Sequence, residues 1–205
     1  MKERPILFSG EMVLALLEGR KTQTRRQVKL PMWAQECNED HEFEMDGDPD
    51  WPHAISRKTG CLSAIECPYG VPGDRLWMRE THAIVPQSAY WHDPTIQHRE
   101  HDHQWAIYRE GWERSAPTWK PSIHMPRWAS RITLEITGVR VERLQDIGEE
   151  DAFAEGIRGG DWLGDPVGEY AALWDKINGP GTWDKNTWTW VIEFKPCAAS
   201  SGRQP

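Results

Sequence analysis

Alternation of apolar and polar residues in one long stretch constrains the fold of this chain most strongly. Segment 130–144, SRITLEITGVRVERL, carries alternate apolar residues on both sides of Gly138. A period of two is typical of a strand with one buried face, and an internal glycine indicates a β-bulge. Segments 186–194 and 73–80 alternate in the same way, which predicts a core built from strands. The buried faces are expected to hold Ile132, Leu134 and Ile136, and Trp188, Trp190, Ile192 and Phe194.

In three other segments the apolar residues recur with the spacing of an α-helix. The first follows Ser9, a favoured capping residue, and stops at Gly19. The second is expected to begin at Asp146 as its cap and to stop at Gly156, and the third to begin near Pro166. Strands interleaved with helices predict an α+β domain, most economically a small closed or nearly closed β-barrel with helices at its rim.

Two stretches show no sustained period. Residues 31–72 are rich in acids, proline and glycine, and residues 85–129 are rich in histidine and tryptophan. Both are interpreted as long loop insertions, which commonly cover a functional opening. The remainder predicts one domain over 1–196, followed by a flexible tail at 197–205.

Charge and hydropathy exclude several classes of protein. The net charge of −8 argues against a long track of phosphate contacts, because such a track needs a broad basic face. No apolar run reaches the length of a signal peptide core or of a membrane helix, so we expect a cytoplasmic protein with no membrane partner. Four cysteines among 205 residues do not suggest a disulfide scaffold.

Positive charge is concentrated in residues 16–26, LLEGRKTQTRR, which also hold two threonines. One reading is a solvated, helix-capping patch, which is the usual fate of exposed charges. The other reading is a site for an anionic or polar substrate. The pattern of charges by itself leaves both readings open.

Residues 19–26, Gly-Arg-Lys-Thr-Gln-Thr-Arg-Arg, resemble the Gly-x-Lys-x-x-Glu-x-Arg signature of the ASCH domains, relatives of the PUA fold. Gly19, Lys21 and Arg26 match it, and Thr24 stands where Glu is usual. With threonine at that position, the chain resembles the bacterial amidohydrolases that act on N4-acetylcytidine. The resemblance extends to the predicted strands, about half of the chain, and the N-terminal segment looks like phage- and prophage-carried members.

This resemblance implies a PUA-like barrel and an amidohydrolase that uses Lys21, Thr24 and Glu155 and needs no cofactor. A nucleoside is then the small-molecule substrate, and the oligomeric state is not predicted. Relatives of the same fold imply alternatives: an RNA-binding module or a ribonuclease that holds single-stranded RNA in the same cleft. A structural phage component is a further alternative.

The chemistry expected of the three residues follows from their types. The Thr24 hydroxyl would be the nucleophile, and Lys21 would be its base if neighbouring cations and burial lower the pKa of its ammonium. Glu155, in the last turn of a predicted helix, would then donate a proton to the leaving nitrogen. In the opposite assignment Lys21 stabilises the oxyanion and Glu155 is the base. Because Lys21 and Thr24 have opposite parity, the chain must turn between them for both to converge.

Four further residues are candidates for gripping a base and its sugar or phosphate, since both guanidinium groups and indole rings stack on bases. For the tryptophan, core packing is the competing interpretation. These candidates are Arg26, Arg79, Trp128 and Arg131.

The sequence contains two candidate sets of metal ligands, and neither predicts a metal site. His98, His101 and His103 lie close together, but a solvated polar loop is the simpler interpretation. The thiols of Cys37, Cys61 and Cys67, together with His41, lack the paired spacing of zinc sites, so buried free thiols are expected.

Overall fold

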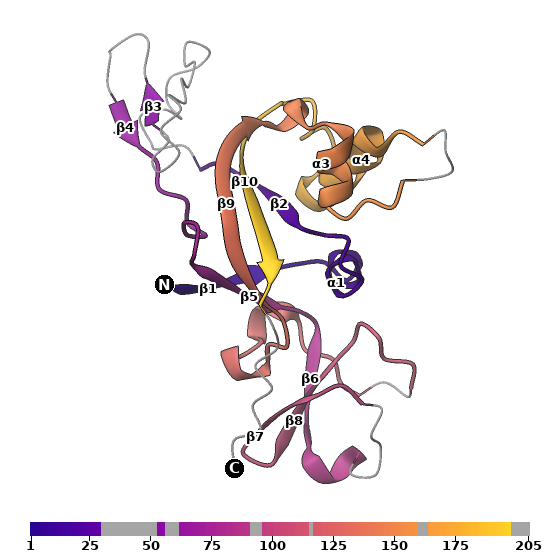
Figure 1. Ribbon diagram of the computed structural model, residues 1–205. Coiled ribbons are helices and arrows are strands. Elements are labelled where there is room, and N and C mark those ends of the chain that lie inside the picture. The colour runs from indigo at the N-terminus through magenta and orange to yellow at the C-terminus, as the bar shows by residue number, and fades with distance from the viewer. Residues whose placement is uncertain (30–52, 56–61, 91–95, 115–116, 160–163, 198–205) are drawn as a thin grey trace.

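The computed structural model of the chain describes residues 1–29, 53–55, 62–90, 96–114, 117–159 and 164–197. Its main element is a five-stranded sheet with the strand order β1-β5-β9-β10-β2 (Figure 1). The strands β1 and β5 are parallel, and the other pairs are antiparallel. The five strands are β1 (Glu3–Leu7), β2 (Gln23–Gln27), β5 (Arg75–Arg79), β9 (Thr133–Arg143) and β10 (Trp188–Pro196). The expected core of strands is confirmed.

The long pair β9 and β10 contains the expected bulge. Glu193 pairs with Gly138, whereas the next residue, Phe194, pairs with Ile136. Thr137 is therefore an extra residue on β9, and the bulge bends the strand as the glycine indicated. The alternating residues of both strands form one buried layer with the apolar face of the first helix. The layer includes Leu134, Ile136, Trp190, Ile192, Phe194, Met12, Val13 and Leu16.

Helix α1 (Gly10–Leu17) follows Ser9, whose hydroxyl accepts a hydrogen bond from the Met12 amide. Helix α4 (Pro166–Asn178) starts after Asp165, whose carboxylate accepts from the Gly168 amide. Both helices begin where the sequence predicts. Helix α3 (Glu149–Ala154) begins later than expected, since Gly148 is its N-cap and makes no side-chain bond.

The cap predicted at the start of α3 is wrong for a local reason. Asp146 lies inside a 3₁₀ turn, Leu144–Asp146, that directly follows β9. This turn buries Leu144 completely and so fixes how the chain leaves the strand. Helices α1, α3 and α4 lie on one side of the β9–β10 pair, with α1 below α3 and α4 in Figure 1.

The sheet does not close into a barrel within the described residues. β1 and β2 are its two edges, with no backbone pairing between them. A side chain spans this opening instead: the Arg26 guanidinium of β2 donates a 2.7 Å hydrogen bond to the Leu7 carbonyl of β1. The fold is α+β as predicted, whereas the closed barrel is not observed. None of the described helices has the length and apolar character needed to cross a membrane.

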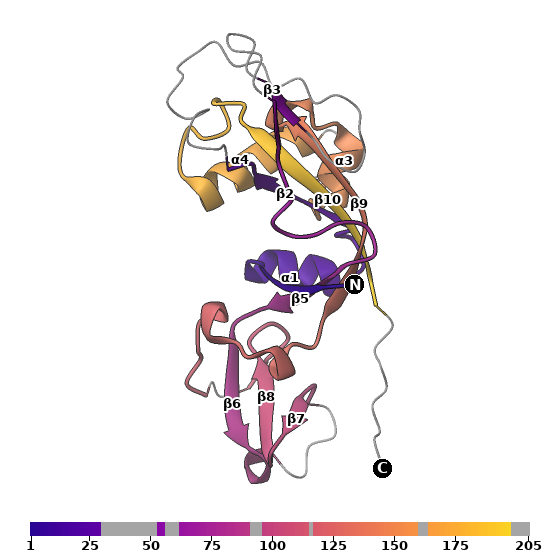
Figure 2. The ribbon, with the colours of Figure 1, turned by 90° about the vertical axis from the view of Figure 1, so that its left-hand side faces the viewer.

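Segment 85–129 contains regular structure, contrary to the expectation of a long loop. Strands β6 (His82–Pro86), β8 (Gln104–Tyr108) and β7 (Arg99–His101) form a second sheet in that spatial order (Figure 2). Four consecutive residues of β8 are buried, and all of β7 is exposed. Neither strand alternates, so the period of two could not reveal them.

Segment 31–72 also contains two strands. β3 (His53–Ile55) and β4 (Leu62–Ala64) form an antiparallel pair. Most of that segment lies outside the described residues, as does the predicted tail beyond Cys197.

Candidate functional site

The turn between α1 and β2 carries Lys21 to the end of α3. Gly19 has a φ of +73°, and the amides of Arg20 and Lys21 both donate to the Ala15 carbonyl. The next amide, that of Thr22, donates a 2.8 Å hydrogen bond to the Ala154 carbonyl at the end of α3. The chain therefore turns before β2 begins, as the opposite parity of Lys21 and Thr24 required.

Lys21 and Glu155 form a buried ion pair, although 134 positions separate them in sequence. The Lys21 Nζ lies 2.8 Å from Glu155 Oε2 and 2.7 Å from the Glu155 carbonyl oxygen. The two residues are only 1% and 2% exposed. The ammonium also lies 5.6 Å from the centre of the Phe8 ring. Such a pair is costly to bury and is held only because each charge has a partner.

Burial lowers the pKa of the Lys21 ammonium, and the Glu155 carboxylate opposes that shift. Arg26 and Arg25 add to the lowering, as expected from their position in the sequence. Arg20 has other partners, because its guanidinium binds the Glu18 carboxylate and the Gly156 carbonyl. A lysine with a lowered pKa that shares a hydrogen bond with a carboxylate is suited to moving a proton.

Arg25 also belongs to this site, although its position in the sequence suggested only a positive charge close to Lys21. Its side chain is fully buried, and Nη2 donates to Asp151 at 2.7 Å and to Glu142 at 2.9 Å. Its Nη1 lies 3.7 Å from Glu155 Oε1. Asp151 in the first turn of α3 and Glu155 at its C-cap are four positions apart, and that spacing on the predicted helix could have pointed to a shared cation.

Thr24 is completely buried in β2, opposite Ile192 of β10. Its neighbours Gln23 and Arg25 both direct their side chains to Asp151 of α3, so Thr24 lies on the other face of the strand. Among the described residues its hydroxyl has no hydrogen-bond partner. The structure thus brings Lys21 and Glu155 together, and it leaves the Thr24 hydroxyl without a hydrogen bond to either.

Two cavities adjoin Glu155. The larger, of about 300 Å³, lies between α1 and the chain that follows α3, and its rim carries Arg20 and Arg158. The smaller, of about 40 Å³, lies between α1, β2 and α4. Met12, Glu155 and Leu173 line both. Glu155 therefore borders both cavities.

The four predicted substrate-binding residues are divided between two regions. Arg26 lines the smaller cavity beside Glu155. Arg79 donates to the Met125 carbonyl and lies over the Trp77 ring, and Trp128 stacks on His101 at 5.1 Å. These last contacts belong to the second sheet and its surroundings, away from Lys21.

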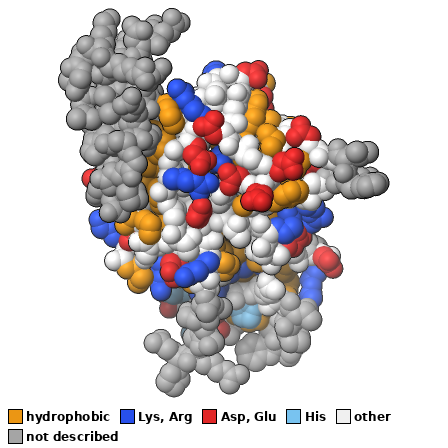
Figure 3. All heavy atoms as spheres, turned by 45° about the horizontal axis from the view of Figure 1, so that its top comes forward, with side chains coloured by type: hydrophobic (Ala, Val, Ile, Leu, Met, Phe, Trp, Pro, Cys, Tyr) orange, Lys and Arg blue, Asp and Glu red, His pale blue; other side chains and the backbone are white. Residues whose placement is uncertain are grey.

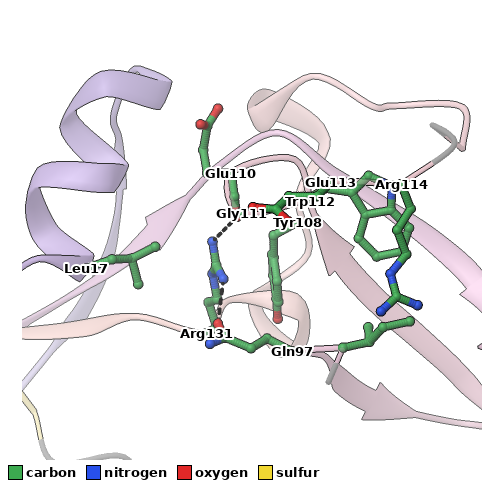
Figure 4. A pocket seen from close by; sticks show the side chains of 10 residues that line it. Leu17, Gln97, Tyr108, Glu110, Gly111, Trp112, Glu113, Arg114 and Arg131 are labelled. Atoms are coloured by element: carbon green, nitrogen blue, oxygen red, sulfur yellow. Dashed lines mark hydrogen bonds between the residues drawn. The ribbon is translucent and has the colours of Figure 1, made fainter. Parts of the chain in front are cut away.

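Arg131 lines a third cavity of about 390 Å³ (Figure 4). Leu17, the last residue of α1, lines the same cavity. Its guanidinium donates to both carboxylate oxygens of buried Glu80, at 2.9 and 2.8 Å, and lies 4.1 Å from the centre of the Tyr108 ring. Dashed lines in the figure mark its further bonds to Gln97 and the Glu110 carbonyl. Arg131 is thus held by an ion pair of its own.

No group of three or more metal-binding side chains is found in the part of the chain that the structure describes. Cys67 is a free, partly buried thiol whose pKa is raised by burial. His98 stacks on Trp105 with ring centres 3.8 Å apart. The other members of the considered zinc set, Cys37, His41 and Cys61, lie outside the described residues.

The face above the helices carries mixed charge. Figure 3 shows blue and red side chains interspersed there instead of a continuous basic stripe. Ion pairs also compensate charge on the sheet, where Arg140 of β9 binds Glu142, Glu193 and Asp151. A long polyanion would find little uncompensated positive charge on this face.

Comparison with known proteins yields little. No family model and no curated protein matches the chain. One matching solved structure is the crystal structure of protein EF3133 from Enterococcus faecalis V583, described by the family model DUF984. It is 10% identical, with a TM-score of 0.43, over 100% of this chain and 86% of that chain.

Proposed function

We propose that the chain is an ASCH-type amidohydrolase that removes the acyl group from N4-acetylcytidine-type nucleosides. The observation that carries the proposal is the buried Lys21–Glu155 pair, whose glutamate borders two cavities. A proton-transfer pair next to a space of about 300 Å³ is what hydrolysis of a small amide requires.

The reaction consumes one water and yields cytidine and a carboxylic acid. In the step that the family resemblance implies, the Thr24 oxygen bonds to the acyl carbon as its proton passes to the Lys21–Glu155 pair, which requires the buried Thr24 hydroxyl to approach that pair when substrate is bound. The carbon–N4 bond then breaks, and the pair returns the proton to the leaving amino group. Water hydrolyses the resulting Thr24 ester, which releases the acid and restores the hydroxyl.

Glu155→Gln tests the proton-transfer pair. We expect kcat on N4-acetylcytidine to fall roughly a hundredfold or more, since the amide cannot accept or donate the proton. Glu150→Gln, an exposed acid in the same helix, is the matched control and should retain wild-type turnover. Equal activity of the two variants would count against the proposal.

Thr24→Ala tests the nucleophile, with Thr22→Ala as its exposed counterpart. If Thr24 is the nucleophile, its loss abolishes turnover and the acyl adduct detected by intact mass after rapid quenching. Undiminished turnover would remove this role from Thr24 and leave a water activated by the pair as the attacking group. Incubation of wild-type protein with labelled single-stranded RNA separates the amidase from the ribonuclease alternative.

A further inference from the structure

We propose that the small cavity beside Glu155 is the binding site for the substrate's acyl group and restricts that group to short chains. This inference rests on the proposed amidohydrolase function and identifies the acyl part of its substrate.

The position of the cavity supports this assignment. It shares Met12, Glu155 and Leu173 with the larger cavity, and α4 contributes Tyr170, Trp174 and Ile177 to its own walls, opposite the polar residues of β2. Tyr170 and Trp174 in these walls are almost fully buried. An amide placed at Glu155 therefore has a roomy space on one side for the nucleoside and, on the other, a small space with an apolar α4 wall for the acyl chain.

Buried polar atoms in three of its lining residues give independent support. Among the described residues, Trp174 Nε1 has no hydrogen-bond partner. Arg25 Nη1 and Glu155 Oε1 face each other at 3.7 Å, an ion pair that is too long for a hydrogen bond. All three residues line the small cavity. Buried polar groups are almost always paired in native proteins, so this concentration indicates that a bound group completes the site.

The chemical types of these atoms fit an acyl amide. Two are N–H donors, which suit the carbonyl oxygen and the negative charge that develops on it. The third is a carboxylate oxygen, which accepts the N–H of the amide. Arg25 is held in place by Asp151 and Glu142, so its guanidinium is pre-oriented for this role.

The volume sets the limit on chain length. The smaller cavity has a volume of about 40 Å³, against about 300 Å³ for the larger one. The methyl of an acetyl group fits such a space, whereas a propyl or phenyl group requires the walls to move. Overpacking a rigid interior is unfavourable, so longer acyl groups are expected to react slowly.

The test measures kcat/KM of the wild-type protein on N4-acetyl-, N4-butyryl- and N4-benzoylcytidine. We expect a fall of roughly tenfold or more from acetyl to butyryl, and a further fall to benzoyl. The matched variants are Ile177→Ala and Leu14→Ala. Ile177 lines only the small cavity and is 47% exposed, whereas Leu14 lines only the larger one and is 37% exposed. Neither substitution removes a core side chain.

Ile177→Ala should raise the ratio of kcat/KM on the butyryl substrate to kcat/KM on the acetyl substrate several-fold. Leu14→Ala should leave that ratio unchanged. Trp174→Phe should also raise the ratio, while lowering kcat on the acetyl substrate because a donor is lost. Equal rates on all three substrates, with a ratio that Ile177→Ala does not move, would overturn the acyl site and leave the amidohydrolase standing. Absence of turnover on every substrate would instead overturn the proposed function, and the acyl site with it.

Discussion

The Lys21 ammonium binds Glu155 twice, through the carboxylate at 2.8 Å and through the backbone carbonyl at 2.7 Å. Glu155 is the C-cap of α3, so the same cation neutralises a side chain and satisfies a carbonyl at the negative end of a helix. One cation therefore holds two groups of the same residue.

Removal of one member of this pair should destabilise the fold strongly. Lys21→Met removes the nearer cation of the buried Glu155 carboxylate and leaves only Arg25, at 3.7 Å, which costs about 3 kcal/mol. Urea unfolding of this variant should show the loss, whereas exposed Lys29→Met should stay within about 0.5 kcal/mol of wild type. The double variant Lys21→Met/Glu155→Gln should be more stable than Lys21→Met alone. A double variant as unstable as the sum of the two single variants would argue against the pair.

Lys21 should also make stability depend on pH. Burial lowers the pKa of its ammonium below the usual 10.5, although the Glu155 carboxylate opposes this. Between the lowered pKa and 10.5 the unfolded chain binds more protons than the folded one, so the contribution of Lys21 to the unfolding free energy rises with pH. The difference in unfolding free energy between wild type and Lys21→Met should therefore increase as pH rises towards 10.5. A difference that is flat or falls over this range would contradict the assignment.

Gly156 should tolerate no side chain. Its φ is +98°, and an added Cβ would lie 2.8 Å from the Ala15 Cβ and 3.2 Å from the Lys21 Cβ. Gly156→Ala combines backbone strain with a clash between α1 and the turn after α3, so we expect a loss of about 1–3 kcal/mol. Gly148→Ala is the control, because that glycine has a φ of −91° and open space around its Cβ position. Thermal unfolding of both variants makes the comparison.

Lysine should not be able to replace Arg131 in its bidentate ion pair with Glu80. Arg131→Lys keeps the charge but cannot reach both oxygens of a buried carboxylate, and the expected loss is about 1–3 kcal/mol. Arg127→Lys changes an exposed pair with Glu3 and should cost less than about 1 kcal/mol. Equal melting temperatures of the two variants would show that the buried bidentate ion pair contributes little.

Local patterns in the sequence determined the elements that carry a regular period. The strands over 130–144 and 186–194, the bulge at Gly138 and the helix after Ser9 follow from residues close to one another in the chain. Elements without a period were missed: β8 is buried on both faces and β7 is exposed throughout, so neither alternates. Asp146 was misread because tertiary burial of Leu144 decides the local turn.

The sequence by itself pointed to Lys21 and Glu155 only through the resemblance of residues 19–26 to a known family signature, because the residue types alone left a solvated patch as the simpler reading. Only the tertiary structure decided that they touch, that Arg25 joins them, that Arg131 belongs to a separate cavity and that the sheet stays open between β1 and β2. The physical reason is the distance along the chain over which each interaction acts. Strand periods, caps and turns depend on neighbours within a few residues, whereas burial, ion pairing and sheet closure depend on how distant segments pack.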